Sequence, residues 1–176
     1  MRVAEHTFIF TDLVGFTTLT AERGDDHGAD VALAFYARVR ALLREHGAEE
    51  VKTIGDAMML RCDDPAGAVA LGLQIVRAMD APPALPPVRV GMHTGPAVDR
   101  AGDWYGTTVN VAARLCAAAG GGEVLISEQT STAAARLPRV RLGERRLHWL
   151  KNVSRPVAAH VATEHRCPST LMEAAA

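Results

Sequence analysis

The sequence predicts one α+β domain with a ferredoxin-like core, whose elements follow the order βααββαβ. Strand-like and helix-like hydrophobic periods alternate along its 176 residues. A Gly-Asp dipeptide separates two short apolar runs within residues 51–62, which is typical of an antiparallel hairpin. The composition, 48% hydrophobic and 22% charged, is ordinary for a globular protein. We therefore expect a mainly antiparallel sheet with helices on one face and an extra C-terminal hairpin.

The first half of the chain supplies four of these elements. Residues 6–11 form an apolar run that predicts a buried strand, followed by a turn at Gly15. Residues 30–46 carry a helical stripe and end at "GAEE"; the stripe consists of Val31, Phe35, Val39, Leu42 and Leu43. Residues 51–62 then form the hairpin, with its turn at Gly55 and Asp56.

The second half continues the alternation. Pro65 predicts the start of another helix, which the proline-rich stretch "APPALPP" ends. Residues 88–95 and 123–127 read as strands, and residues 107–118 between them as a helix that stops at "GGG". Residues 140–151 and 156–163 are expected to be the closing strands. We assign residues 1–165 to the domain and expect residues 166–176, which lack any pattern, to be a disordered tail.

Charge and cysteine content argue against several classes of protein. A net charge of −1 provides no general attraction to nucleic acid or to anionic membranes. The three cysteines form no CxxC pair, which favours reduced thiols in an intracellular protein. No apolar run is long enough to span a bilayer. We therefore expect a cytoplasmic protein with no nucleic-acid partner and no direct membrane contact.

Two aspartates stand where elements end: Asp12 follows the first strand, and Asp56 lies in the hairpin turn. If those strands are neighbours in the sheet, both carboxylates reach one edge, where their repulsion favours a shared cation. A small set of oxygen ligands suits Mg²⁺ or Mn²⁺, which keep water and accept phosphate oxygens. Each residue also has a purely structural interpretation, Asp12 as a helix cap and Asp56 as a turn residue.

Four stretches of the chain resemble the motifs of one enzyme family. In chain order they are "FIFTDLVGFTTL", "VKTIGDAMM", "GMHTGPAV" and "GDWYGTTVNVAARL". They are similar to the successive motifs of the class III nucleotide cyclase catalytic domain, the family of adenylate and guanylate cyclases. The resemblance extends from about Phe8 to Val161. It implies formation of a 3′,5′-cyclic nucleotide and pyrophosphate by attack of the ribose 3′-hydroxyl on the α-phosphate.

The resemblance implies a metal site. Asp12 and Asp56 match the two aspartates that hold two divalent cations, Mg²⁺ or Mn²⁺, in each active site. Leu13, the neighbour of Asp12, is assigned to the same metal site. Two ions suit in-line displacement at phosphorus, because one can activate the attacking oxygen while the other neutralises the leaving group.

A phosphate site is implied as well. The turn and helix start at Gly15, Phe16 and Thr17 would present backbone N–H groups to the polyphosphate. Lys151 matches a family lysine that contacts the terminal phosphates, although its "WLKNV" surroundings depart from the usual "KGKG" form.

Four further positions match the part of the family site that reads the base and performs the chemistry. Lys52 and Asp103 match the purine-reading residues. Adenine offers an acceptor at N1 and a donor at its amine, which a lysine and an aspartate complement, whereas guanine presents the opposite pattern. Guanylate cyclases tend to carry Glu and a small polar residue there, so ATP is the implied substrate. Asn110 and Arg114, on one helix face, match catalytic residues that position the ribose and stabilise transition-state charge.

The resemblance also implies a head-to-tail homodimer. The metal half and the purine half of the family site meet across a two-fold interface, and this chain carries both halves, so two equivalent composite sites are expected. Two alternatives stay open: a catalytically silent nucleotide-binding or regulatory module, and a guanylate cyclase. A palm-type nucleotidyl transferase such as a diguanylate cyclase would require a GG[DE]EF-like turn in place of "TIGDAM".

Overall fold

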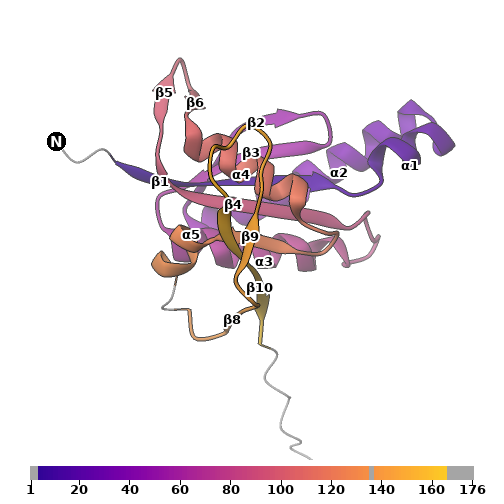
Figure 1. The fold of residues 1–176 in the computed structure, drawn as a ribbon. Helices are drawn as coiled ribbons and strands as arrows, with labels where there is room; N and C mark the ends of the chain where they lie inside the picture. Colours follow the sequence, from indigo (N-terminus) through magenta and orange to yellow (C-terminus); the bar gives the residue numbers. More distant parts are fainter. Residues whose placement is uncertain (1–3, 135–136, 166–176) are drawn as a thin grey trace, which may run out of the picture.

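Strand β1, Glu5–Leu13, runs through the centre of a computed structural model that describes residues 4–134 and 137–165 (Figure 1). The other strands of its sheet are β2 (Ala48–Ile54), β3 (Ala57–Cys62), β4 (Val88–Pro96), β7 (Val124–Ser127), β8 (Val140–Leu142), β9 (Arg146–His148) and β10 (Val157–Glu164). Within the described residues they form an eight-stranded sheet of order β2-β3-β1-β4-β7-β10-β8, and β9 pairs with β10. Only β4 and β7 pair in parallel here, so the sheet is mainly antiparallel.

The helix that begins at Pro65 has a clear local cause for its start. Asp64 caps the helix that starts at Pro65, because its carboxylate accepts the N–H groups of Ala66 and Gly67, each at 3.1 Å. The helices are α1 (Phe16–Arg23), α2 (Asp25–Leu43), α3 (Pro65–Met79), α4 (Thr107–Ala118) and α5 (Glu128–Ala133), with a 3-10 turn at Arg44–His46. Strands β5 (Val98–Arg100) and β6 (Asp103–Tyr105) form a separate two-stranded ribbon that stands out from the body (Figure 1).

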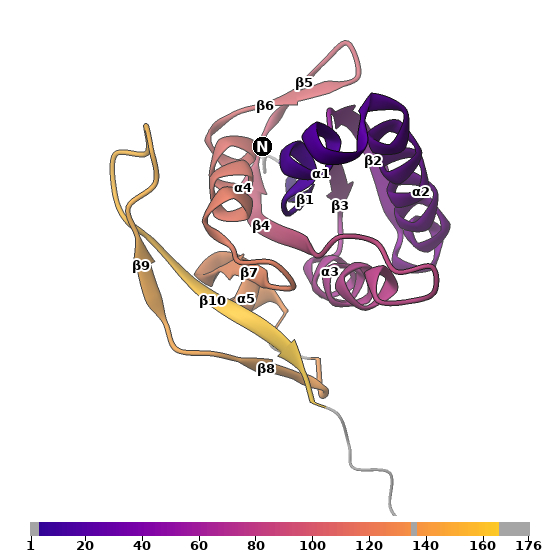
Figure 2. The same cartoon turned by 90° about the vertical axis from the view of Figure 1, so that its right-hand side faces the viewer.

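Successive residues of β1 serve two different cores, because side chains alternate across a strand. Ile9 and Leu13 belong to the core under α2 and α3, whereas Phe8 packs with Val109 and Ala112 of α4 on the other face. Figure 2 shows α1, α2 and α3 on one side of β1 and α4 on the other. The expectation of helices on one face therefore holds for α2 and α3 and is wrong for α4. A continuous apolar run such as Phe8 to Phe10 needs cover on both faces.

Helix α4 lies directly on β4 because Gly91 has no side chain. A Cβ at this position would lie 1.9 Å from the backbone nitrogen of Cys116 and 2.4 Å from its Cα. Only glycine permits such an approach of helix and strand. The contact fixes α4 over the same sheet face as Phe8 and Met59.

The predicted α+β class, the antiparallel core and the closing C-terminal hairpin are confirmed. Helix α4 has the predicted bounds, whereas the helix expected at residues 30–46 begins at Asp25 and gives way to the 3-10 turn after Leu43. The ribbon and α5 were not predicted. The expected tail, residues 166–176, lies outside the described residues, and the domain range 1–165 stays a prediction. Among the described residues, no helix has the length and apolarity needed to cross a membrane.

Candidate active site

Asp12 and Asp56 reach one cavity of about 300 Å³ at the end of β1. The β1–β3 register places Asp12 opposite Ala57, the residue after Asp56. The backbone nitrogen of Leu13 lies 3.4 Å from the Asp56 carbonyl oxygen. Burial and the nearby Asp12 charge raise the pKa of the Asp56 carboxyl above its ordinary value. The structure thus brings together the two carboxylates that the sequence could place only at the ends of separate elements.

Arg89 of β4 is a third charged residue in this cavity, and sequence reasoning missed it. Its Nε and Nη2 atoms both donate to Oδ2 of Asp12, at 2.8 and 2.5 Å. Its Nη1 atom donates to the carbonyl of Ala117 near the end of α4, at 3.1 Å. The sequence feature that could have pointed to Arg89 is its place as a charged residue inside the apolar strand "VRVGM". Its pairing with Asp12, however, follows from a β1–β4 register that the sequence does not reveal.

The wall of the cavity is the loop between β1 and α1. Gly15 adopts a left-handed conformation, with φ of 78°, and the start of α1 has no side-chain cap. Asp12 therefore does not act as the helix cap. The lining of the wall consists of Leu13, Val14, Gly15, Phe16 and Thr17. Backbone N–H groups at the start of α1 thus border the same space as the two carboxylates.

Tyr36 of α2 holds the hairpin turn that carries Asp56. It is the second residue, after Arg89, whose contact with the candidate site the sequence did not reveal. Its hydroxyl donates to the carbonyl of Gly55. The guanidinium carbon of Arg40 lies 5.5 Å from the centre of the Tyr36 ring. Burial, followed by the Asp56 charge, raises the pKa of Tyr36, so its hydroxyl keeps the proton that it donates. The turn is therefore fastened to α2 as well as to the sheet.

Lys52 and Asp103 form a second charged group. The Nζ atom of Lys52, on β2, lies 2.5 Å from Oδ2 of Asp103, on the ribbon strand β6. The hydrogen bond from Lys52 and another from the Trp104 backbone N–H lower the pKa of the Asp103 carboxyl. Lys52 is therefore not a merely solvated strand-edge lysine, since its ammonium has a fixed carboxylate partner.

The structure does not bring the other predicted residues into the carboxylate cavity. Asn110 and Arg114 lie on the exposed side of α4, and Lys151 lies exposed in the turn after β9. Neither they nor the Lys52–Asp103 pair line the space around Asp12. One chain thus holds a carboxylate half and a lysine-aspartate half that face separate parts of its surface.

The donor set of the cavity fits a hard divalent cation. Two carboxylates converge here, and burial together with the Asp12 charge raises the pKa of Asp56, so Arg89 compensates the pair only in part. Among residues 4–134 and 137–165, no cluster of three or more His, Cys, Asp or Glu side chains offers a more complete protein cage. A cation here would keep open positions for water or phosphate oxygens, as Mg²⁺ does in nucleotide sites.

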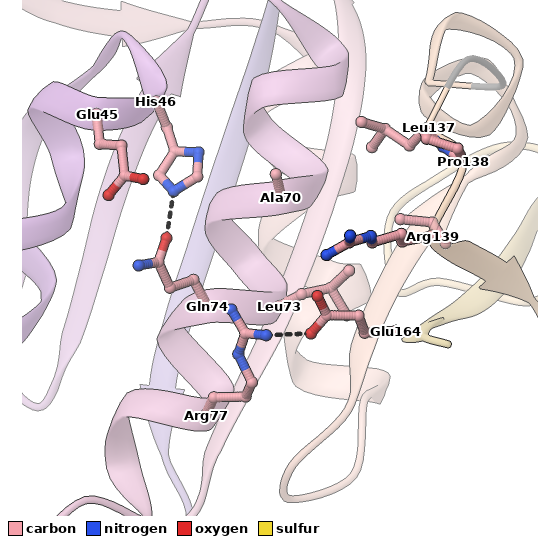
Figure 3. A pocket seen from close by; sticks show the side chains of 11 residues that line it. Glu45, His46, Ala70, Leu73, Gln74, Arg77, Leu137, Pro138, Arg139 and Glu164 are labelled. Carbon is pink, nitrogen blue, oxygen red and sulfur yellow. Dashed lines mark hydrogen bonds and ion pairs between the residues drawn. The ribbon is translucent and has the colours of Figure 1, made fainter. Parts of the chain in front are cut away.

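A second cavity, of about 340 Å³, opens elsewhere, between α3 and the β8–β10 region (Figure 3). Two contacts inside it are the hydrogen bond of His46 with Gln74 and the ion pair of Arg77 with Glu164. None of the site residues predicted from the sequence lines this cavity, and the carboxylate of Glu164 in it already has an arginine partner. The carboxylate cavity around Asp12 is therefore the better candidate for chemistry.

Comparison with known proteins gives one consistent result. The family model of the adenylate and guanylate cyclase catalytic domain matches residues 2–148. A pH-sensitive adenylate cyclase of Mycobacterium tuberculosis is 40% identical over 135 residues, covering 75% of this chain and 33% of that protein. An adenylate cyclase of Streptomyces griseus is 36% identical over 117 residues, covering 66% of this chain and 29% of that protein.

A solved structure agrees with these relatives on the fold. The adenylyl cyclase CyaB from P. aeruginosa superposes with a TM-score of 0.80 at 23% identity, covering 94% of this chain and 96% of that one. The curated relatives are longer, since the chain spans about a third of their length.

Proposed function

The chain belongs to the family of adenylate and guanylate cyclase catalytic domains, and from this premise we propose that it is an adenylate cyclase. It converts ATP to 3′,5′-cyclic AMP and pyrophosphate. The observation that carries the choice of ATP is the contact of Lys52 with Asp103 at 2.5 Å. This pair offers adenine a donor for N1 and an acceptor for the amine, and guanine would leave both groups facing the wrong partner. A guanylate cyclase is disfavoured for that reason.

The carboxylate cavity would hold two divalent cations, Mg²⁺ or Mn²⁺, on Asp12 and Asp56 beside Leu13. When bound, such ions supply charge neutralisation on the phosphates and make the attacking 3′-hydroxyl more acidic. The protein's own part is to orient the polyphosphate: the backbone N–H groups of Gly15, Phe16 and Thr17 face it from the start of α1. Arg89, which borders the same cavity, adds a guanidinium within reach of bound phosphate oxygens.

The remaining residues act from the other half of the site. Asn110 positions the ribose, Arg114 stabilises charge that develops on the α-phosphate, and Lys151 contacts the terminal phosphates. Preorganised donors of this kind typically contribute about 10²–10³ in rate. The three side chains are exposed in the single chain and lie outside the carboxylate cavity, which supports a site completed by a second copy.

We therefore place each active site across a head-to-tail homodimer with two equivalent composite sites. In this arrangement the Asp12 half of one chain meets the Lys52 half of its partner, and two-fold symmetry generates the second site. The first test is direct: purified protein with ATP or GTP and with Mg²⁺ or Mn²⁺, followed by identification of the product. Formation of cyclic GMP in preference to cyclic AMP would contradict the assignment of substrate.

Subunit complementation tests the composite site. Asp12→Ala and Arg114→Ala should each be inactive alone, because every dimer then lacks one essential group in both sites. After the two proteins are mixed and exchange subunits, about half of the dimers are mixed, and each has one intact site, so about a quarter of the parent activity should return. Arg145→Gln, which removes a surface arginine paired with Glu128, serves as the active control. Mixtures that stay inactive despite measured subunit exchange would refute the shared site.

A further inference from the structure

The ribbon that carries Asp103 has little support of its own. Strands β5 and β6 pair through only three residues each, Val98 to Arg100 with Tyr105 to Asp103, and they are separate from the main sheet. An isolated two-stranded ribbon is marginally stable in water. The turn at its tip contains Ala101 and Gly102, both with positive φ, and the ribbon points away from the body (Figure 1). A contact outside the ribbon must therefore fix the position of Asp103.

The ion pair of Asp103 with Lys52 is one such contact, and the next residue, Trp104, makes a second. Side chains alternate along a strand, so its indole points away from the side that Asp103 occupies and packs onto the main sheet. The centre of the indole lies 4.7 Å from the His6 ring at an interplanar angle of 64°, and 5.6 Å from the Phe8 ring. The guanidinium carbon of Arg61 lies 5.2 Å from the same centre, within range of a cation–π interaction.

The surface beneath the indole is itself held in place. Arg61 has a side chain that is only 15% exposed, and it donates to Glu49 at 2.8 Å and to Asp63 at 2.5 Å. The Nδ1 atom of His6 lies 2.6 Å from the same Asp63 oxygen. Residues from β1, β2 and β3 thus form a fixed platform, on which the indole rests.

Trp104 also contacts Asp103 through its backbone. Its N–H donates to Oδ1 of Asp103 at 2.8 Å, while Lys52 donates to Oδ2 of the same carboxylate. The two donors fix the plane of the carboxylate, and one of them moves with the backbone that the indole anchors. A displacement of about 1 Å at such a group can cost as much as 100-fold in a reaction that depends on orientation.

We propose that Trp104 is a positioning residue for base selection: its indole, anchored on His6 and Arg61, holds the Asp103 carboxylate against Lys52. This rests on the proposed function, in which Lys52 and Asp103 read the purine. Trp104 thereby determines how strongly ATP is preferred over GTP without contacting the base through its ring.

Steady-state kinetics with both nucleotides tests the proposal. Trp104→Leu should lower kcat/KM for ATP roughly tenfold, mainly through KM, and change kcat/KM for GTP by less than about twofold. Trp104→Phe, which keeps an aromatic ring on His6, should restore most of the preference for ATP. Arg61→Gln should act in the same direction as Trp104→Leu, whereas Arg145→Gln should match the parent. Equal losses for ATP and GTP in the Trp104 and Arg61 variants would show a purely structural role and overturn the proposal.

A measurement without turnover separates this inference from the proposed function. Carbon NMR titration of the Asp103 carboxyl should show a low pKa in the parent and a higher one in Trp104→Leu, because the Lys52 contact that lowers it is weakened. An unchanged pKa in that variant would overturn the positioning role, whatever the activity. If Lys52→Glu leaves the ratio of ATP to GTP use unchanged, the base-reading assignment fails, and the titration still decides whether Trp104 positions Asp103.

Discussion

Replacing Arg89 by Gln should strengthen cation binding at the carboxylate cavity, because the guanidinium competes for Asp12. Two of its N–H groups donate to the same oxygen, Oδ2 of Asp12, and a cation that takes this oxygen must displace them. At about 4 Å between charge centres and an effective dielectric of about 20, their attraction is about 4 kcal/mol before hydration is subtracted. The side chains are 32% and 22% exposed, so we expect a net contribution of about 1 kcal/mol.

This value predicts two measurable shifts. Without divalent cation, Arg89→Gln should melt about 2–4 °C below the parent, since Asp12 and Asp56 then repel each other without a counter-charge. Addition of Mg²⁺ or Mn²⁺ should favour the variant instead. The variant should gain more in Tm than the parent does, and its apparent Kd for the cation should be about fivefold lower.

Thermal unfolding in the absence of nucleotide, at constant ionic strength and rising MgCl₂ or MnCl₂, is the assay. Arg145→Gln is the matched control, because it removes an arginine that pairs with Glu128 at 2.7 and 3.2 Å outside the cavity. It should not change the response to cations, and Asp12→Asn should abolish most of that response. Equal or weaker cation binding by Arg89→Gln than by the parent would refute the competition.

Two further predictions concern the base and a buried histidine. Lys52→Glu should sharply reduce ATP use and raise GTP use only slightly, because a full switch also needs a change at Asp103; unchanged conversion of ATP, measured by product chromatography, would contradict the adenine-reading role. Burial lowers the pKa of His93 to about 4 from its ordinary 6.5, so the unfolded chain binds the extra proton between these values. Stability should therefore fall as the pH drops below about 6.5, by up to about 1.4 kcal/mol per pH unit. His93→Asn should flatten this slope in urea titrations, and a slope equal to that of the parent would rule out His93 as its source.

The sequence was informative wherever one local pattern decides the structure. The helical stripe, the Gly-Asp turn and Pro65 each act within a few residues, and the elements they predict are present. Periodicity could not assign α4 to a face, because that depends on Gly91, whose absent side chain matters only when Cys116 lies against it. The ribbon was missed because its strands are three residues long, too short for a hydrophobic period.

The same distinction applies to the candidate site. Asp12 and Asp56 could be nominated because each carboxylate stands at the end of an apolar strand, where its position alone is informative. Arg89 and Tyr36 could not be predicted as site residues, because their contacts with the site depend on strand register and packing. Arg89 lies opposite Asp12 in β4, and Tyr36 reaches the hairpin turn from α2. Side chains that support a site from neighbouring elements carry no pattern in the sequence around them.

Within the carboxylate half and within the lysine-aspartate half, charged side chains are already paired in the single chain. An uncompensated charge that is partly removed from water costs free energy, about 1 kcal/mol for an ion pair as exposed as that of Arg89 with Asp12. In this chain Arg89 compensates Asp12, and Asp103 compensates Lys52. In the proposed function, a nucleotide with its cations would recruit the groups of both pairs, because the cation would replace the guanidinium and the base would share the donor and acceptor of the second pair. Under that proposal the fold keeps its charged groups close to their working positions, and substrate binding would exchange partners instead of creating new buried charges.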